Sequence, residues 1–170
     1  PRTMNPELLR LANIAANHLR NRGETIAIAE SSAGGLISSS LLAVPGASRY
    51  FLGGAVVYTL QARQGLVGIT QNEMDEAGIR SSSEPYASRL ASRIREIHNS
   101  DWGLAETGAA GPTGNRYGDL AGHSCIALCG PQNLSMTLET GDNDRAENMI
   151  RFAATALSQL VNALKTGTGA

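Results

Sequence analysis

Residues 25–35 read TIAIAESSAGG, and residues 36–44 continue as LISSSLLAV. The first six residues are a short run rich in isoleucine and alanine, which predicts a strand from Thr25 to Glu30. A turn of serine and glycine follows, and the apolar segment after it predicts a helix that ends before Pro45. A strand that leads through a turn into a helix is typical of α/β proteins, so this stretch indicates a sheet covered by helices.

The alternation of strands and helices continues on both sides of this stretch. Asn5 and Gly23 mark the start and the end of a predicted first helix. Further strands are predicted over residues 53–59, 102–106, 124–128 and 134–140, and further helices over residues 60–67 and 71–77, from Ser83 or Glu84, and from Asp142 or Asn143. The last two strands form a predicted hairpin. We therefore predict a three-layer α/β/α sandwich with a mixed, mostly parallel sheet.

The length and charge of the chain fit one globular domain. We expect residues 1–165 to form this domain and residues 166–170 to be a disordered tail. The 170 residues carry 14 basic and 15 acidic side chains, so the formal charge is −1. No overall positive field therefore favours nucleic acid or an anionic membrane as a partner.

Lysine and cysteine usage excludes several kinds of site. Lys165 is the single lysine and lies five residues from the end of the sequence. Unless the tail folds back, this excludes a P-loop, a pyridoxal Schiff base and a serine–lysine dyad, because each of these sites needs a lysine. Cys125 and Cys129 match no zinc-site spacing, and reduced thiols in a cytoplasmic protein are the simpler interpretation. Residues 1–4 lack the apolar core of a signal peptide, and no apolar run approaches ~18 residues, so we expect a cytoplasmic protein.

Three loops leave the carboxyl ends of the predicted strands, where α/β sheets bind ligands. In the first, Ser31 lies at a strand-to-helix turn, where helix amides stabilise a phosphate or an oxyanion. The alternative is that Ser31 or Ser32 simply caps the helix. In the second loop, Arg63 would stabilise a phenolate at Tyr58, although a packed tyrosine and a solvated arginine explain this pair more simply when it is taken alone.

The third loop begins TGAAGPTG at residues 107–114. Glycine-rich loops donate backbone N–H groups to anions, and a long connector in a compact domain is more often functional. Arg116, Tyr117 and Asp119 add polar side chains nearby. On the next strand, His123 and Cys125 share one face, and a buried or edge histidine is favoured there over a metal site, because no carboxylate or second histidine has a matching spacing.

These loops carry motifs of one protein family. Residues 29–35 read AESSAGG, residues 45–63 read PGASRYFLGGAVVYTLQAR, and SEP, TGAAGP and GH follow at residues 83–85, 107–112 and 122–123. Over most of the chain this order resembles the C-terminal domain of the competence/damage-inducible CinA family. The family pattern runs AESCTGG, PGSSxYFxGGxVxYSNxxK, SEP, TGxAGP and GT.

The resemblance implies an α/β/α fold and hydrolysis of the carboxamide of nicotinamide mononucleotide to nicotinate mononucleotide and ammonia. This reaction cleaves a linear amide C–N bond in pyridine nucleotide salvage. The resemblance also implies Ser31 as the nucleophile, Tyr58 and Arg63 as the residues that activate it, a small nucleotide as the partner, and no cofactor or metal. The substrate-binding positions that we expect are Gly34, Gly35, Thr107, Gly108, Ala109, Gly111, Arg116 and His123.

Four positions depart from the family pattern. Ala33, Leu60, Arg63 and His123 stand where the family has Thr, Asn, Lys and Thr. A neutral lysine accepts a proton, whereas an arginine, with a pKa above ~12, supplies only charge. Three alternatives follow: Tyr58 is the base, as a phenolate held by Arg63; His123 has taken over proton transfer; or the deamidase reaction is lost.

The expected function is an amidohydrolase in which Ser31 attacks a carboxamide and amide donors of a glycine loop hold the oxyanion. The alternative is a non-catalytic module that binds a nucleotide or phosphate. A third interpretation is a domain that acts through self-association, since its helices are rich in small residues. Such residues permit close packing between subunits and equally within a core, and we expect a homo-oligomer.

Overall fold

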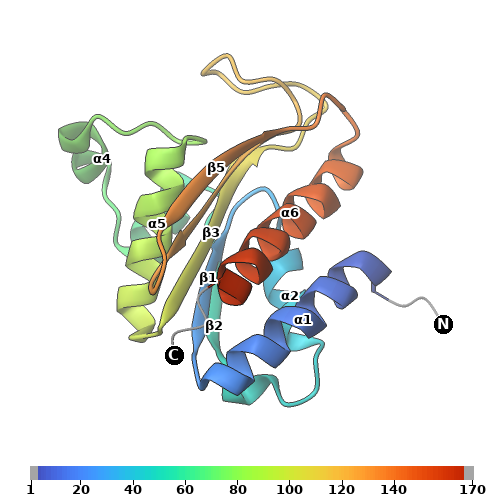
Figure 1. Cartoon of the computed structure of the whole chain (residues 1–170). Helices are drawn as coiled ribbons and strands as arrows, with labels where there is room; N and C mark the ends of the chain where they lie inside the picture. Colours follow the sequence, from blue (N-terminus) through green and yellow to red (C-terminus); the bar gives the residue numbers. More distant parts are fainter. Residues whose placement is uncertain (1–3, 167–170) are drawn as a thin grey trace.

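The computed structural model describes residues 4–166, in which helices cover both faces of a central sheet (Figure 1). The helices are α1 (Pro6–Arg22), α2 (Leu36–Leu42), α3 (Leu60–Val67), α4 (Gln71–Ala77), α5 (Glu84–His98) and α6 (Arg145–Thr166), with a 3₁₀ turn at Ala47–Arg49. The strands are β1 (Ile26–Glu30), β2 (Phe51–Val56), β3 (Trp102–Ala109), β4 (His123–Cys129) and β5 (Leu134–Glu139). Of the tail expected over residues 166–170, Thr166 ends α6 and the others lie outside the described residues.

The sheet is mixed, as predicted. Its strand order is β2-β1-β3-β4-β5, and β1 is parallel to both of its neighbours, whereas β4 is antiparallel to both of its own. The parallel half comes from the strand–helix alternation and the antiparallel half contains the predicted hairpin. β3 runs three residues further than predicted because residues 107–109 pair with residues 123–125 of β4.

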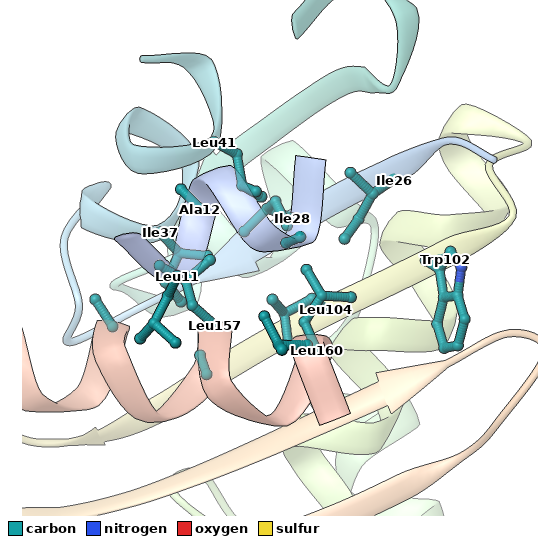
Figure 2. Close-up of a cluster of buried hydrophobic side chains, with 14 of the residues drawn as sticks. Leu11, Ala12, Ile26, Ile28, Ile37, Leu41, Trp102, Leu104, Leu157 and Leu160 are labelled. Carbon is teal, nitrogen blue, oxygen red and sulfur yellow. The ribbon is translucent and has the colours of Figure 1, made fainter. Parts of the chain in front are cut away.

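The two faces of the sheet carry side chains of different size. Ile28 and Leu104 are fully buried on the face covered by α1, α2 and α6, and Figure 2 shows them beside Leu157 and Leu160 of α6. The face toward α5 carries small residues instead, namely Ala27, Ala29, Ala105 and Ala127. A Cβ on Gly103 would lie 2.1 Å from the carbonyl oxygen of Ala91 in α5. Small residues therefore allow α5 to lie close to the sheet.

Most helix ends follow the predicted capping residues. The Asn5 side chain accepts hydrogen bonds from two amides of the first turn of α1, and Gly23 ends this helix in the left-handed region, with φ 64°. Of the two alternatives for α5, Ser83 is the cap. The prediction for α6 was wrong by one or two residues, because the Asp144 carboxylate, rather than residue 142 or 143, accepts from the amide of Glu147.

Two further features bear on the surroundings of the protein. Cys125 and Cys129 are free cysteines, and no disulfide joins them. Within residues 4–166, no helix combines the length and the apolar character that crossing a membrane requires.

Candidate functional site

The amides at the start of α2 are occupied by a carboxylate of the chain itself. Glu30, the last residue of β1, is fully buried and accepts hydrogen bonds from the backbone amides of Gly35 (2.9 Å), Ile37 (3.1 Å) and Ser38 (2.8 Å). Gly35 is the N-cap residue and makes no side-chain cap bond. Neither serine of the turn caps α2, and the positive end of this helix is closed to a phosphate or an oxyanion. Both interpretations of this helix end were therefore wrong.

A second buried carboxylate holds the turn after β1 from beneath. Glu106 of β3 accepts hydrogen bonds from the backbone amides of Ser31 (3.1 Å) and Ala33 (2.8 Å) and from the hydroxyls of Ser32 and Ser124. Burial raises the pKa of the Glu106 carboxyl, although these hydrogen bonds act in the opposite direction. Four donors on one carboxylate fix the conformation of the turn.

Ser31 and Tyr58 lie at the same edge of the sheet. The carbonyl oxygen of Glu30 accepts a hydrogen bond from the amide of Val57 at 2.7 Å, and Ser31 and Tyr58 are the next residues along the two segments. The Ser31 side chain is half-buried, and its hydroxyl has no hydrogen-bond partner within residues 4–166. Within residues 4–166, the Ser31 hydroxyl is therefore free to interact with a ligand beside the start of the second loop.

The arginine partner of Tyr58 is Arg145, from the first turn of α6. Its Nη2 donates to the Tyr58 hydroxyl at 3.1 Å, and its Nη1 donates to the carbonyl oxygen of Gly111 at 2.5 Å. The Tyr58 side chain is 61% exposed, so a ligand has access to it. Arg145 thus joins the second and third loops, and its role was not predicted because no motif includes it.

Arg63 does not contact Tyr58. Its guanidinium is buried on the opposite side of the second loop, where Nε donates to the hydroxyl of Tyr86 at 3.1 Å and Nη2 donates to the hydroxyl of Ser81. The ring of Tyr86 also stacks under this guanidinium, at 4.6 Å from its centre. A phenolate at Tyr58 would therefore be held by Arg145 rather than by Arg63.

The first loop contacts α6 at Gly34. Gly34 has φ 66° and Gly35 has φ 99°, and both values favour glycine. A Cβ on Gly34 would lie 2.8 Å from the terminal methyl carbon of Met149 in α6. The first loop, like the other two, thus lies against the N-terminal half of α6.

The third loop begins later than predicted. Thr107, Gly108 and Ala109 belong to β3, and a Cβ on Gly108 would lie 2.2 Å from the carbonyl oxygen of His123. Glycine at position 108 is therefore required by strand packing. The loop itself starts at Ala110, whose carbonyl oxygen accepts a hydrogen bond from Asn148 of α6 at 2.9 Å.

His123 is buried, and acceptors face both of its ring nitrogens. Nδ1 lies 2.5 Å from a carboxylate oxygen of Glu139, and Nε2 lies 2.7 Å from the carbonyl oxygen of Ser82. Burial alone would lower the pKa of His123, yet the Glu139 carboxylate, the Ser82 carbonyl and the nearby Asp119 raise it above its ordinary value. A ring that donates from both nitrogens is protonated, so His123 suits a cationic, structural position better than that of a base.

Figure 1 shows the third loop extending beyond the end of the sheet between β3 and β4. Arg116, one of the expected substrate-binding residues, lies in this loop and is exposed, and its Nη2 donates to the hydroxyl of Tyr117 at 3.0 Å. Among residues 4–166, no group of three or more histidine, cysteine or acidic side chains is arranged to hold a metal ion.

The fold is an α/β/α domain whose polar loops gather at the carboxyl ends of its parallel strands, the edge at which α/β sheets bind ligands. Residues 8–164 match the CinA C-terminal domain, and the chain belongs to this family.

The chain is similar to curated and solved proteins of this kind. It is 41% identical to a CinA-like protein of Gloeobacter violaceus over 71% of this chain and 28% of that protein. It is 34% identical to a CinA-like protein of Gloeothece citriformis over 88% of this chain and 36% of that protein. The chain therefore spans about a third of the length of these curated relatives.

Solved structures match nearly all of the chain. The competence/damage inducible protein CihA from Agrobacterium tumefaciens superposes with a TM-score of 0.86 at 26% identity, over 97% of this chain and 99% of that one. A competence or damage-inducible protein from Enterobacter asburiae superposes with a TM-score of 0.85, also at 26% identity, over 94% and 99%. These structures confirm the predicted α/β/α fold.

Proposed function

We propose that this chain is an amidohydrolase that converts nicotinamide mononucleotide to nicotinate mononucleotide and ammonia, with Ser31 as the nucleophile. The observation that carries the proposal is the position of the Ser31 hydroxyl. This hydroxyl has no hydrogen-bond partner among residues 4–166, and it lies on a turn whose backbone amides are held by Glu106. The residue before it, Glu30, accepts a hydrogen bond from Val57, the residue before Tyr58. Such a hydroxyl is available to attack a substrate, and the proposal gives the role of its activating base to Tyr58.

The proposed reaction has two halves. The Ser31 oxygen attacks the carboxamide carbon as its proton passes to Tyr58 in the phenolate form, and Tyr58 returns this proton to the departing nitrogen as the C–N bond breaks. Water then attacks the acyl-serine ester and gives one proton to the Tyr58 phenolate, which passes it to the Ser31 oxygen as the C–O bond breaks. The product leaves as a carboxylate, and its remaining proton is taken up by the released ammonia. Arg145 stabilises negative charge on the Tyr58 oxygen, a role predicted for Arg63.

His123 and the α2 amides have no chemical part in this proposal. Both ring nitrogens of His123 are engaged by acceptors, and the α2 amides are engaged by Glu30. The oxyanion would instead be held by backbone amides of the third loop, which Arg145 and Asn148 anchor to α6.

A second function, a nucleotide-binding module without turnover, is favoured by one observation. Arg63 stands where the family has lysine, and it packs against Tyr86 and Ser81 away from Tyr58. On this alternative the loops bind a nucleotide, but no group near Ser31 accepts its proton.

Ammonia release from nicotinamide mononucleotide separates the two functions. The amidohydrolase predicts release by the wild type and a loss of at least about a thousandfold in kcat for Ser31→Ala. Ser48→Ala is the matched control, because Ser48 is exposed and distant in the fold from the carboxyl edge of the sheet, and it should keep the wild-type rate. Absent release, or equal release by wild type and Ser31→Ala, would refute the amidohydrolase, and binding without release would support the module.

A further inference from the structure

Arg63 is a buried cation that faces no carboxylate in the described part of the chain. Its side chain belongs to a residue only 6% exposed, and its hydrogen-bond partners are the hydroxyls of Tyr86 and Ser81. Neither partner carries a charge at neutral pH, and burial raises the pKa of Tyr86 above its ordinary value. The Tyr86 ring and the two hydroxyls offset part of the cost of burying this charge, and without a carboxylate the position still favours an anion supplied from outside the chain.

Two further guanidinium groups surround Tyr117 of the third loop. Those of Arg80 and Arg116 lie 5.1 and 5.0 Å from the centre of its ring. The Tyr117 hydroxyl accepts a hydrogen bond from Arg116 at 3.0 Å and interacts with the hydroxyl of Ser81, which also accepts from Arg63. Ser81 therefore connects the buried arginine to the loop.

Positive charge is in excess at this cluster. Asp119 forms two hydrogen bonds with Arg80, at 2.8 and 3.1 Å, and neutralises it. Arg63 and Arg116 have no carboxylate partner among residues 4–166. Burial would raise the pKa of Tyr117, yet the hydrogen bonds from Arg116 and Ser81 and the charges of Arg116 and Arg63 lower it, which agrees with a positive field.

We propose that Arg63, Ser81 and Arg116 form a subsite for the phosphate monoester of the nucleotide, an inference that rests on the proposed function. Two guanidinium groups without a carboxylate match a group that carries a charge of about −1.5 to −2 at neutral pH. The planar fork of arginine also suits phosphate oxygens, and hydroxyl donors complete the coordination.

The subsite and the reacting groups flank the same loop. Tyr58 directly precedes Thr59, the N-cap residue of α3, and Arg63 follows this cap by four residues, about one helical turn. Tyr58 contacts Arg145 of α6, whereas Arg63 contacts Tyr86 of α5. The proposal therefore requires one ligand to span this loop, with its amide toward Tyr58 and its phosphate toward Arg63.

The test compares a ligand with phosphate to the same ligand without it. Binding of nicotinamide mononucleotide and of nicotinamide riboside is measured by calorimetry on Ser31→Ala, so that turnover does not interfere. We expect the mononucleotide to bind at least about tenfold more tightly than the riboside. Adding Arg116→Gln, a change at an exposed side chain, should weaken binding of the mononucleotide at least about tenfold and leave the riboside within about twofold.

Two more variants complete the test. Arg63→Gln should weaken binding of the mononucleotide as Arg116→Gln does, provided that circular dichroism shows a folded protein. If Arg63→Gln does not fold, the Arg116→Gln measurement alone tests the subsite. Arg49→Gln removes the same charge from an exposed position outside the cluster and should change neither affinity. Equal affinities for the two ligands, no binding of either, or equal losses in Arg49→Gln and Arg116→Gln would overturn the subsite.

The outcomes also separate the subsite from the amidohydrolase. Phosphate-dependent binding that needs Arg116, combined with no ammonia release by the otherwise wild-type chain, would refute the amidohydrolase and leave the subsite in place. Ammonia release with equal KM for the mononucleotide and the riboside would refute the subsite and leave the amidohydrolase in place.

Discussion

Arg145 donates a hydrogen bond to the hydroxyl of Tyr58 across 87 residues of sequence, and the two atoms lie 3.1 Å apart. The same guanidinium reaches the carbonyl oxygen of Gly111. One side chain of α6 therefore sets the relative position of the second and third loops. Because a guanidinium has several donors in a fixed plane, it can engage both partners at once.

Replacing Arg145 should impair the reaction more than the fold. Arg145→Gln is expected to lower kcat for ammonia release about 10- to 100-fold, because the charge beside Tyr58 and the link to Gly111 are both lost. Arg151→Gln is the matched control on the exposed face of the same helix. Steady-state assays check this, and equal kcat values for the two variants would contradict the role of Arg145.

Replacing Glu106 should destabilise the protein. In Glu106→Gln an amide group takes the place of one carboxylate oxygen, so donors from the turn at residues 31–33 lose their acceptor. We expect the free energy of unfolding in urea to fall by about 3 kcal/mol. Glu76→Gln, at an exposed position of α4, should change it by less than about 0.5 kcal/mol. A stable Glu106→Gln would show that Glu106 does not hold the turn.

His123 should make stability depend on pH in a defined direction. Burial alone would lower the pKa of His123 in the folded state. Glu139, the Ser82 carbonyl and Asp119 favour the charged ring, and the folded-state pKa is raised as a result. The stabilisation is therefore complete below the unfolded-state pKa of about 6.5 and is lost as the pH rises through the higher folded-state pKa. Burial also raises the pKa of the neighbouring Cys125 thiol, so Cys125 adds a loss of stability above the unfolded-state thiol pKa of about 8.5, and only the difference between wild type and His123→Gln reports on His123.

Urea titrations between about pH 6 and pH 9 measure this contribution. The wild type should lose stability over the interval, and His123→Gln should lose less. A slope that His123→Gln leaves unchanged would contradict the assignment.

Two glycines should respond to alanine in opposite directions. In Gly103→Ala the new Cβ would lie 2.1 Å from the carbonyl oxygen of Ala91, so α5 must move, at a cost of at least about 2 kcal/mol. Gly65 lies in α3 with no atom within 4 Å of its Cβ position, and Gly65→Ala should stabilise the protein by about 0.5–1 kcal/mol. Thermal unfolding checks both, and a stable Gly103→Ala would show that the contact is not tight.

Much of the fold follows from the sequence because its signals are local. Asn5, Gly23 and Ser83 act within one turn of their helices, and strand–helix alternation is sufficient to predict the layers. The end of β3 was placed too early, since glycine at residue 108 is typical of a loop but here is required by the carbonyl oxygen of His123 on the next strand. That contact cannot be read from the neighbours of residue 108 in the sequence.

The site was predictable only where its residues belong to a motif. The segments of Ser31 and Tyr58 meet at the sheet edge through the hydrogen bond between Glu30 and Val57, although β2 ends at Val56 and the predicted strand over residues 53–59 placed its end too late. The partners of Arg63 are Tyr86 and Ser81, and Arg145 approaches from a helix that starts 87 residues after Tyr58. Glu30 and Glu106 offered one signal, an acidic residue at the end of an otherwise apolar predicted strand, which indicates a carboxylate with a specific buried role.

The closure of the α2 amides by Glu30 has an evolutionary consequence. A nest of main-chain amides persists through most substitutions, because every residue but proline supplies the same N–H group. Here the main-chain donors of α2 are already filled by Glu30, so in our proposal the phosphate of the nucleotide is bound by side chains on separate loops. A single substitution can replace each of these side chains, so ligand preference can change by point mutation while the backbone keeps its conformation.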